Sequence, residues 1–97
     1  MTSKERAYLI HLSASEPTVL YVGKQGISPD LVNNLDEALT ARELVKVGLQ
    51  KTCFDDIHAA AATLAERSRS QVVQVIGRKM VFYRTNPERK HPIEMPR

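Results

Sequence analysis

Cysteine, aromatic residues and long apolar runs are scarce in this chain of 97 residues, and tryptophan is absent. Because Cys53 is the only cysteine, an intramolecular disulfide is excluded and a reducing compartment is the expectation. We interpret Cys53 as a small buried hydrophobic residue rather than a nucleophile. The apolar run near the N-terminus extends only from Ala7 to Ile10, too short for a secretory signal or a membrane span. We therefore expect a cytoplasmic protein without a membrane partner.

Residue groupings that support catalysis are also lacking. The spacing of the three histidines is not that of metal ligands (His11, His58 and His91). We interpret the adjacent carboxylates of Asp36-Glu37 and Asp55-Asp56 as solvated side chains or helix caps rather than acid–base pairs. The chain contains no Gly-x-Ser-x-Gly, Walker or dinucleotide-binding motif. These absences predict a protein that is not an enzyme and uses no cofactor, metal or small-molecule substrate; a small enzyme acting on RNA is the less favoured alternative.

The charge of the chain is distributed unevenly. Apolar residues make up 42% of the chain and charged residues 26%, as in ordinary soluble domains, and the length leaves room for one core only. The net charge is +3, but residues 28–66 carry three bases and seven acids, whereas residues 67–97 carry eight bases and two acids. One strongly basic end favours a polyanionic partner, and a solvated surface with a charged tail is the alternative.

The pattern of apolar residues and turns predicts the element order α-β-α-β-α-β-β. Helices are expected over 3–13, over 29–41 and from Asp55 or Asp56 onward, and strands over 18–22, 44–50, 71–76 and 80–84. This order predicts an α/β fold, a compact two-layer sandwich of helices on a four-stranded mixed sheet. We expect the strand over 18–22 to be buried and the hairpin over 71–84 to add an antiparallel edge. The domain then spans 1–84, and 85–97 is a basic, proline-containing flexible tail.

A turn of sequence Gly23-Lys24-Gln25-Gly26 separates the first predicted strand from a helix capped by Ser28. The two glycines let the backbone approach another chain closely, because no Cβ stands in the way. The helix N-terminus offers unpaired N–H groups and a partial positive charge, and Lys24 adds a mobile cation. RNA-binding KH modules grip the nucleic-acid backbone through a Gly-x-x-Gly loop in this manner. We therefore predict that these four residues contact RNA phosphates.

Further basic residues are secondary candidates for RNA contact. The hairpin turn contributes Arg78 and Lys79, Arg84 follows it, and Lys4 lies in the first predicted helix. The aromatic side chains are interpreted as core or sheet residues rather than as a base-stacking platform (Tyr8, Tyr21, Phe54, Phe82 and Tyr83). The chain is therefore expected to hold the RNA backbone rather than to read single bases.

Three segments resemble the CRM domain, named for chloroplast RNA splicing and ribosome maturation, in its stand-alone bacterial YhbY-like form. They are Tyr21-Val22-Gly23-Lys24-Gln25-Gly26-Ile27, Glu43-Leu44-Val45-Lys46-Val47, and Val73-Gln74-Val75-Ile76-Gly77-Arg78-Lys79 with Val81 and Tyr83-Arg84. The resemblance covers nearly the whole chain and implies a fold similar to the C-terminal domain of translation initiation factor three. It places the family's Gly-x-x-Gly loop on the turn from Gly23 to Gly26.

The same resemblance implies an RNA-binding protein that associates with precursors of the large ribosomal subunit and assists ribosome assembly. The expected partners are large-subunit ribosomal RNA in pre-ribosomal particles and, in addition, ribosomal proteins. The residues leave one further alternative open. In that alternative the chain is a protein-interaction adaptor that docks on a ribosomal protein through the acidic segment 28–66, without contact to RNA.

Overall fold

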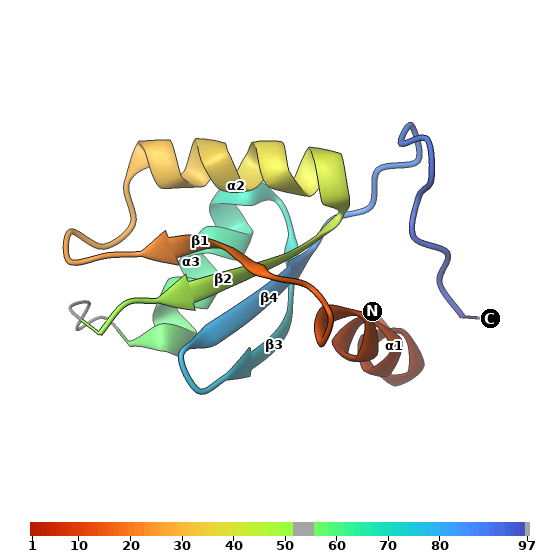
Figure 1. Cartoon of the computed structure of the whole chain (residues 1–97), viewed down its shortest axis with the longest axis horizontal. Helices are drawn as coiled ribbons and strands as arrows, with labels where there is room; N and C mark the ends of the chain where they lie inside the picture. The colour runs from red at the N-terminus through yellow and green to blue at the C-terminus, as the bar shows by residue number, and fades with distance from the viewer. Residues whose placement is uncertain (52–55, 97) are drawn as a thin grey trace.

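The computed structural model describes residues 1–51 and 56–96 as an α/β fold (Figure 1). Cys53, Phe54 and Asp55, for which the sequence analysis gave expectations, lie outside the described residues. The predicted element order is confirmed. The helices are α1 (Ser3–Ser13), α2 (Pro29–Arg42) and α3 (Ile57–Ser68), and the strands are β1 (Thr18–Val22), β2 (Leu44–Leu49), β3 (Gln71–Ile76) and β4 (Lys79–Tyr83). Among the described residues, no helix combines the length and the apolar character needed to cross a membrane.

Each helix begins at a side chain that accepts a backbone N–H. The Thr2 hydroxyl accepts the Glu5 N–H at 3.1 Å, and Glu5 Oε1 accepts the Thr2 N–H at 2.8 Å, so the two residues form a capping box. Ser28 caps α2 in the same way, with proline as the first helical residue. Of the two aspartates considered for α3, Asp56 is the cap. The bounds of the helices therefore follow from local chemistry.

The four strands form one mixed sheet in the order β1-β2-β4-β3. β1 and β2 are parallel, whereas β4 is antiparallel to both of its neighbours. The hairpin thus adds antiparallel pairs, with the last strand of the chain inside the sheet and β3 at the edge. β1 is the other edge, so the expectation that this strand is buried is wrong for Tyr21, which is 49% exposed. An edge strand has a neighbour on one side only, and no helix covers Tyr21.

Helices lie on both faces of the sheet. α2 and α3 cover one face, here called the α2/α3 face, and bury the main core against it. α1 packs on the opposite face, the α1 face, where Leu9 belongs to one buried cluster with Leu44 and Tyr83. Leu44 begins β2 and Tyr83 ends β4, so α1 covers one end of its face only (Figure 1). The two-layer sandwich therefore has a third, partial layer at that end.

The segment after β4 forms no helix or strand, but it is held by one buried carboxylate. Glu43 ends α2 with φ +65° and is fully buried. Its carboxylate accepts the Asn86 N–H at 3.1 Å, the Ile93 N–H at 2.8 Å and Arg89 Nη1 at 2.9 Å. The segment predicted as a tail is thus bound to the domain as far as residue 93. Its flexibility stays a prediction.

Candidate nucleic-acid interface

The turn Gly23-Lys24-Gln25-Gly26, here called the GKQG loop, closes directly after β1. The Gly26 N–H donates to the Gly23 carbonyl oxygen at 3.0 Å, and these two residues form an isolated bridge. Gly26 has φ +76°, a left-handed conformation that glycine adopts without strain. Lys24 and Gln25 are exposed at the tip. Within residues 1–51 and 56–96, Lys24 has no hydrogen-bond or ion-pair partner, so its charge is available to a ligand.

Gly23 is covered by the protein itself. A Cβ at this position would lie 3.0 Å from Gln50 Oε1. The Gln50 N–H in turn donates to the Val22 carbonyl oxygen at 2.9 Å, which holds Gln50 beside the end of β1. The sequence predicts that another chain approaches the backbone at both glycines. At Gly23, however, the space beside the backbone is occupied by the Gln50 side chain. Gly26 serves the backbone conformation of the turn, and the exposed tip remains for a ligand.

The turn between β3 and β4 lies beside the end of β2. The Leu49 N–H donates to the Arg78 carbonyl oxygen at 2.7 Å, and Arg78 Nε donates to the Leu49 carbonyl oxygen at 3.0 Å. Arg78 Nη2 donates to the carbonyl oxygen of Gln50. Because Gln50 also contacts β1, the GKQG loop and the hairpin turn lie at the same end of the sheet, on either side of the end of β2 (Figure 1). We call this the loop end; it comprises the GKQG loop and residues 49–50 and 77–79.

The N-terminus of α2 offers fewer donors than the sequence suggests. Pro29 has no N–H, and the Leu31 N–H already donates to the Ser28 hydroxyl at 3.1 Å. Asp30 adds a carboxylate to the first turn, which repels a phosphate. The expectation of several unpaired N–H groups here is therefore wrong. Lys24 is the cation of this region that remains available.

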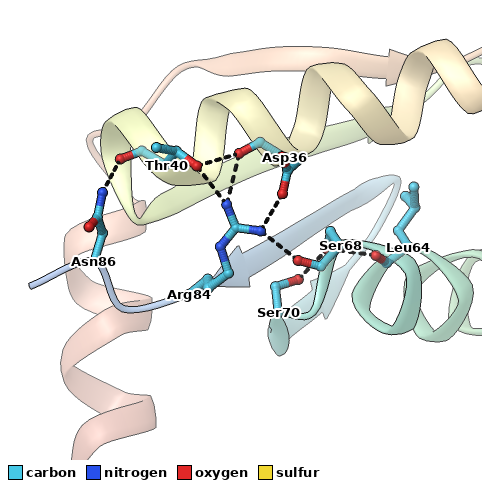
Figure 2. Close-up of polar contacts among 7 residues, drawn as sticks. All are labelled: Asp36, Thr40, Leu64, Ser68, Ser70, Arg84 and Asn86. Carbon is cyan, nitrogen blue, oxygen red and sulfur yellow. Dashed lines mark hydrogen bonds and ion pairs between the residues drawn. The ribbon is translucent and has the colours of Figure 1, made fainter. Parts of the chain in front are cut away.

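Arg84 binds the protein's own acceptors (Figure 2). Its Nη1 donates to Asp36 Oδ1 and to the Ser68 carbonyl oxygen, both at 2.6 Å. Its Nη2 donates to the Asp36 carbonyl oxygen at 2.9 Å and to the Thr40 hydroxyl at 2.8 Å, while Asn86 Nδ2 donates to the Thr40 carbonyl oxygen at 2.8 Å. The Arg84 side chain is only 21% exposed. These contacts, here called the Arg84 clamp, join the end of β4 to α2 and α3 and give Arg84 a structural role.

Lys4 does not join the other candidate residues. It lies in the first turn of α1, and α1 packs against the start of β2 and the end of β4. The loop end is formed by the opposite ends of these two strands, so the structure separates Lys4 from the GKQG loop (Figure 1).

Lys79 lies at the loop end beside an exposed aromatic ring. Its Nζ is 5.1 Å from the centroid of the Tyr21 ring. The interpretation of the aromatic residues as core or sheet residues holds for the buried Phe82 and Tyr83 and for Tyr21, which lies in β1 but is exposed. Lys46 points to the same α1 face, because it alternates with the buried Val45 and Val47 of β2. The sequence analysis did not identify Tyr21 or Lys46 as candidates for RNA contact. The alternation of β2 could have revealed Lys46, whereas the exposure of Tyr21 could be inferred only from the order of the strands.

The loop end can therefore bind a polyanion through exposed cations and a turn with little side-chain bulk. No group of three or more His, Cys, Asp or Glu side chains in the described part of the chain could hold a metal ion. The four strands themselves contain no acidic residue, and their charged residues are Lys46 and Lys79.

Known proteins match this chain closely. The model of the CRS1 / YhbY (CRM) domain matches residues 1–84. The chain is 36% identical over 96 residues to the probable RNA-binding protein YqeI of Bacillus subtilis (strain 168), covering 99% of each chain. It is 39% identical over 70 residues to the probable RNA-binding protein PA4753 of Pseudomonas aeruginosa, covering 72% of this chain and 67% of that relative.

A solved structure agrees with these matches. The solution structure of SAV1595 from Staphylococcus aureus, a hypothetical protein described as a candidate RNA-binding protein, superposes with a TM-score of 0.82 at 40% identity and covers 99% of each chain. The similarity thus includes the fold as well as the sequence. This chain belongs to the CRS1 / YhbY (CRM) domain family.

Proposed function

We propose that this protein binds RNA and assists assembly of the large ribosomal subunit, holding the RNA backbone at the loop end. The observation that carries the proposal is that the exposed GKQG loop and the basic hairpin turn lie at the same end of the sheet. Two segments far apart in the sequence are joined there through Gln50 and the Arg78 side chain. A backbone of regularly spaced phosphates fits such a row of cations.

The relatives support RNA as the partner, since YqeI and PA4753 are both named as probable RNA-binding proteins. The ribosomal context follows from the family resemblance. Large-subunit ribosomal RNA in pre-ribosomal particles is accordingly the RNA that we expect the protein to hold.

The cations of the loop end differ in how strongly other groups of the protein already bind them. Lys24 is exposed and has no partner in the described part of the chain, so it makes the main phosphate contact with the GKQG backbone. Arg78 and Lys79 contribute less, because carbonyl oxygens hold the Arg78 guanidinium and the Tyr21 ring lies beside Lys79. Arg84 is committed to its clamp, and Lys4 lies at the other end of the sheet. Neither is part of the proposed surface.

The adaptor alternative is less favoured than RNA binding because of the surroundings of three acids in its segment. It required the acidic segment 28–66 to present carboxylates to a protein partner. Asp36 is paired with Arg84, Glu43 is buried against Arg89, and Asp56 caps α3. Three of the segment's acids thus serve the fold.

RNA binding across a salt series tests the proposal. We expect Lys24→Ala to weaken binding of single-stranded RNA and to reduce the log–log salt slope by about 0.7, the value for one lost phosphate contact. Arg67→Ala is the matched control, because it removes one exposed charge in the last turn of α3, beside the Arg84 clamp. Equal slopes for the parent and Lys24→Ala would contradict the assignment of the GKQG loop.

The ribosomal part of the proposal has its own test. The protein should co-sediment with precursors of the large subunit in extracts, and Lys24→Ala should reduce the bound fraction. Nuclease treatment of the isolated complex should release the protein. Retention after complete digestion of the RNA would favour a protein contact instead.

A further inference from the structure

One row of residues crosses all four strands on the α1 face. The strand register pairs Tyr21 of β1 with Gly48 of β2, Gly48 with Lys79 of β4, and Lys79 with Ile76 of β3. Paired residues on neighbouring strands point to the same face. Their chain neighbours Val22 and Leu49 are buried under α2 and α3, so this row points to the other side, beyond the end that α1 covers.

The ring of Tyr21 lies on the sheet because residue 48 is glycine. A Cβ on Gly48 would lie 2.7 Å from Cε1 and 2.8 Å from Cδ1 of Tyr21, and 3.2 Å from Lys79 Nζ. Any other residue would displace the ring. Tyr21 is 49% exposed and Ile76 is 59% exposed, so the row ends in an apolar side chain at each edge of the sheet. An aromatic ring held beside a cation and left open to solvent is a stacking surface.

The charge around this row suits a nucleic acid. Lys79 lies within the row, and Lys46 lies two residues from Gly48 on the same face of β2. Neither lysine forms a hydrogen bond or an ion pair with any described residue. A hydrophobic patch that binds another protein is a contiguous apolar surface. Here Lys79 separates the two exposed apolar side chains, Tyr21 and Ile76.

We propose that Tyr21, lying over Gly48 between the GKQG loop and Lys79, stacks against an unpaired base of the bound RNA. The inference rests on the proposed function and adds a base contact to it. Lys79 and Lys46 hold the phosphates beside that base. Stacking tolerates every base because each has a π face, so the contact selects single-stranded RNA rather than a sequence.

The test compares a single-stranded oligoribonucleotide of mixed sequence with an oligomer of the same length that carries no bases. We expect the parent to bind the oligomer with bases more tightly. Tyr21→Leu should lower that affinity about tenfold, as loss of one stacked base does. It should leave the affinity for the abasic oligomer and the salt slope unchanged, because no phosphate contact is lost. Tyr21→Phe keeps the ring and should bind like the parent.

A spectroscopic readout separates stacking from a general disturbance of the sheet. The chain has no tryptophan, so Tyr21→Trp introduces a single one. Its fluorescence should be quenched by the oligomer with bases and remain unchanged with the abasic oligomer. Ile76→Ala is the control for loss of an exposed apolar side chain at the far end of the row, and it should bind like the parent.

Four outcomes overturn the inference. Tyr21→Leu could bind both oligomers as the parent does, or it could weaken both equally, which would indicate a damaged sheet rather than a lost base contact. The tryptophan could also respond equally to the two oligomers. If the parent binds neither oligomer, the proposed RNA binding itself fails and the base contact fails with it. If the parent binds both and Tyr21→Leu changes nothing, only the base contact fails.

Discussion

At the loop end Lys24 is exposed and has no partner among the described residues, whereas at the opposite end Arg84 and Arg89 each bind a carboxylate of the protein. Arg84 pairs with Asp36 on α2, and Arg89 pairs with the buried Glu43. The basic third of the sequence, residues 67–97, therefore coincides only in part, through Arg78 and Lys79, with the basic surface that we propose for RNA.

The two ends also use different residue types. A guanidinium offers five donors in a fixed planar arrangement and can satisfy several carbonyl and carboxylate oxygens at once, as Arg84 does. An ammonium on a flexible stem suits a mobile phosphate, and the available cations on the RNA side include Lys24, Lys46 and Lys79. Arginine is the cation of the structural end, and lysine dominates the end proposed for binding.

Removal of the buried carboxylate of Glu43 should have the largest effect. Glu43→Ala leaves Arg89 and two backbone N–H groups without their acceptor, so we expect the free energy of unfolding to fall by about 3–5 kcal/mol. Urea denaturation measures this loss, and limited proteolysis after residue 85 reports release of the C-terminal segment. The exposed Glu37→Ala on the same helix should stay within about 0.5 kcal/mol of the parent. A loss no larger than that of the control would show that the C-terminal segment is held by other contacts.

Replacement of Arg84 by lysine should have the next largest effect. Arg84→Lys keeps the charge but loses the forked contacts to α2 and α3, and we expect a loss of about 2 kcal/mol in unfolding free energy. RNA affinity of the folded variant should equal that of the parent. A variant of unchanged stability that binds RNA more weakly would instead place Arg84 on the binding surface. Arg67→Lys, without such contacts, serves as the control.

Two substitutions of Gly26 separate conformation from charge at the loop end. The left-handed backbone at φ +76° disfavours any side chain, so Gly26→Asn and Gly26→Asp should each lose about 1 kcal/mol of stability. Gly26→Asn is the neutral control, because it imposes the same backbone strain without the charge. Gly26→Asp should bind RNA about fivefold more weakly than Gly26→Asn, since one charge near a phosphate is worth about 1 kcal/mol in water. Equal affinities would mean that no phosphate lies close to the turn.

The capping box of α1 should give the smallest effect. Hydrogen bonds from the Thr2 backbone and hydroxyl hold the pKa of Glu5 below 4.5. A carboxylate whose pKa is lowered on folding stabilises the folded state above its unfolded pKa and loses this contribution as the pH falls through the folded value. We expect the parent to be slightly more stable than Glu5→Gln at neutral pH, and this difference to shrink below pH 4.5. Thermal midpoints of both proteins at neutral pH and below pH 4.5 measure this difference in stability. A difference that is the same at both pH values would contradict the lowered pKa of Glu5.

The sequence predicts the elements of this fold well and their arrangement less well. Caps, prolines and apolar periodicity act locally, and so Thr2, Ser28 and the stripe of α3 place the helices correctly. Which strand of the hairpin pairs with β2 depends on contacts between distant segments. The buried run from Met80 to Tyr83 is a signal for the inner strand, because a strand covered on both faces is apolar throughout.

The sequence predicts which segments form the candidate site, but it does not predict which of their cations are available to RNA. The GKQG loop and the hairpin turn are visible as basic turns, yet nothing local distinguishes an arginine that clamps two helices from one that is available to RNA. Arg84 and Lys24 have the same formal charge in the sequence and opposite surroundings in the structure. Tyr21 required the register as well, since its exposure depends on the glycine that faces it across the strands.

The position of β4 also determines when the protein can fold during its synthesis. The last strand to be made lies inside the sheet, between β2 and β3. Until it emerges from the ribosome, β3 has no neighbour and the core under α2 and α3 lacks Phe82, which is fully buried. A nascent chain that ends before residue 79 can form only the β1–β2 pair with its helices. The core under α2 and α3 can therefore close only after the segment up to Tyr83 has been made.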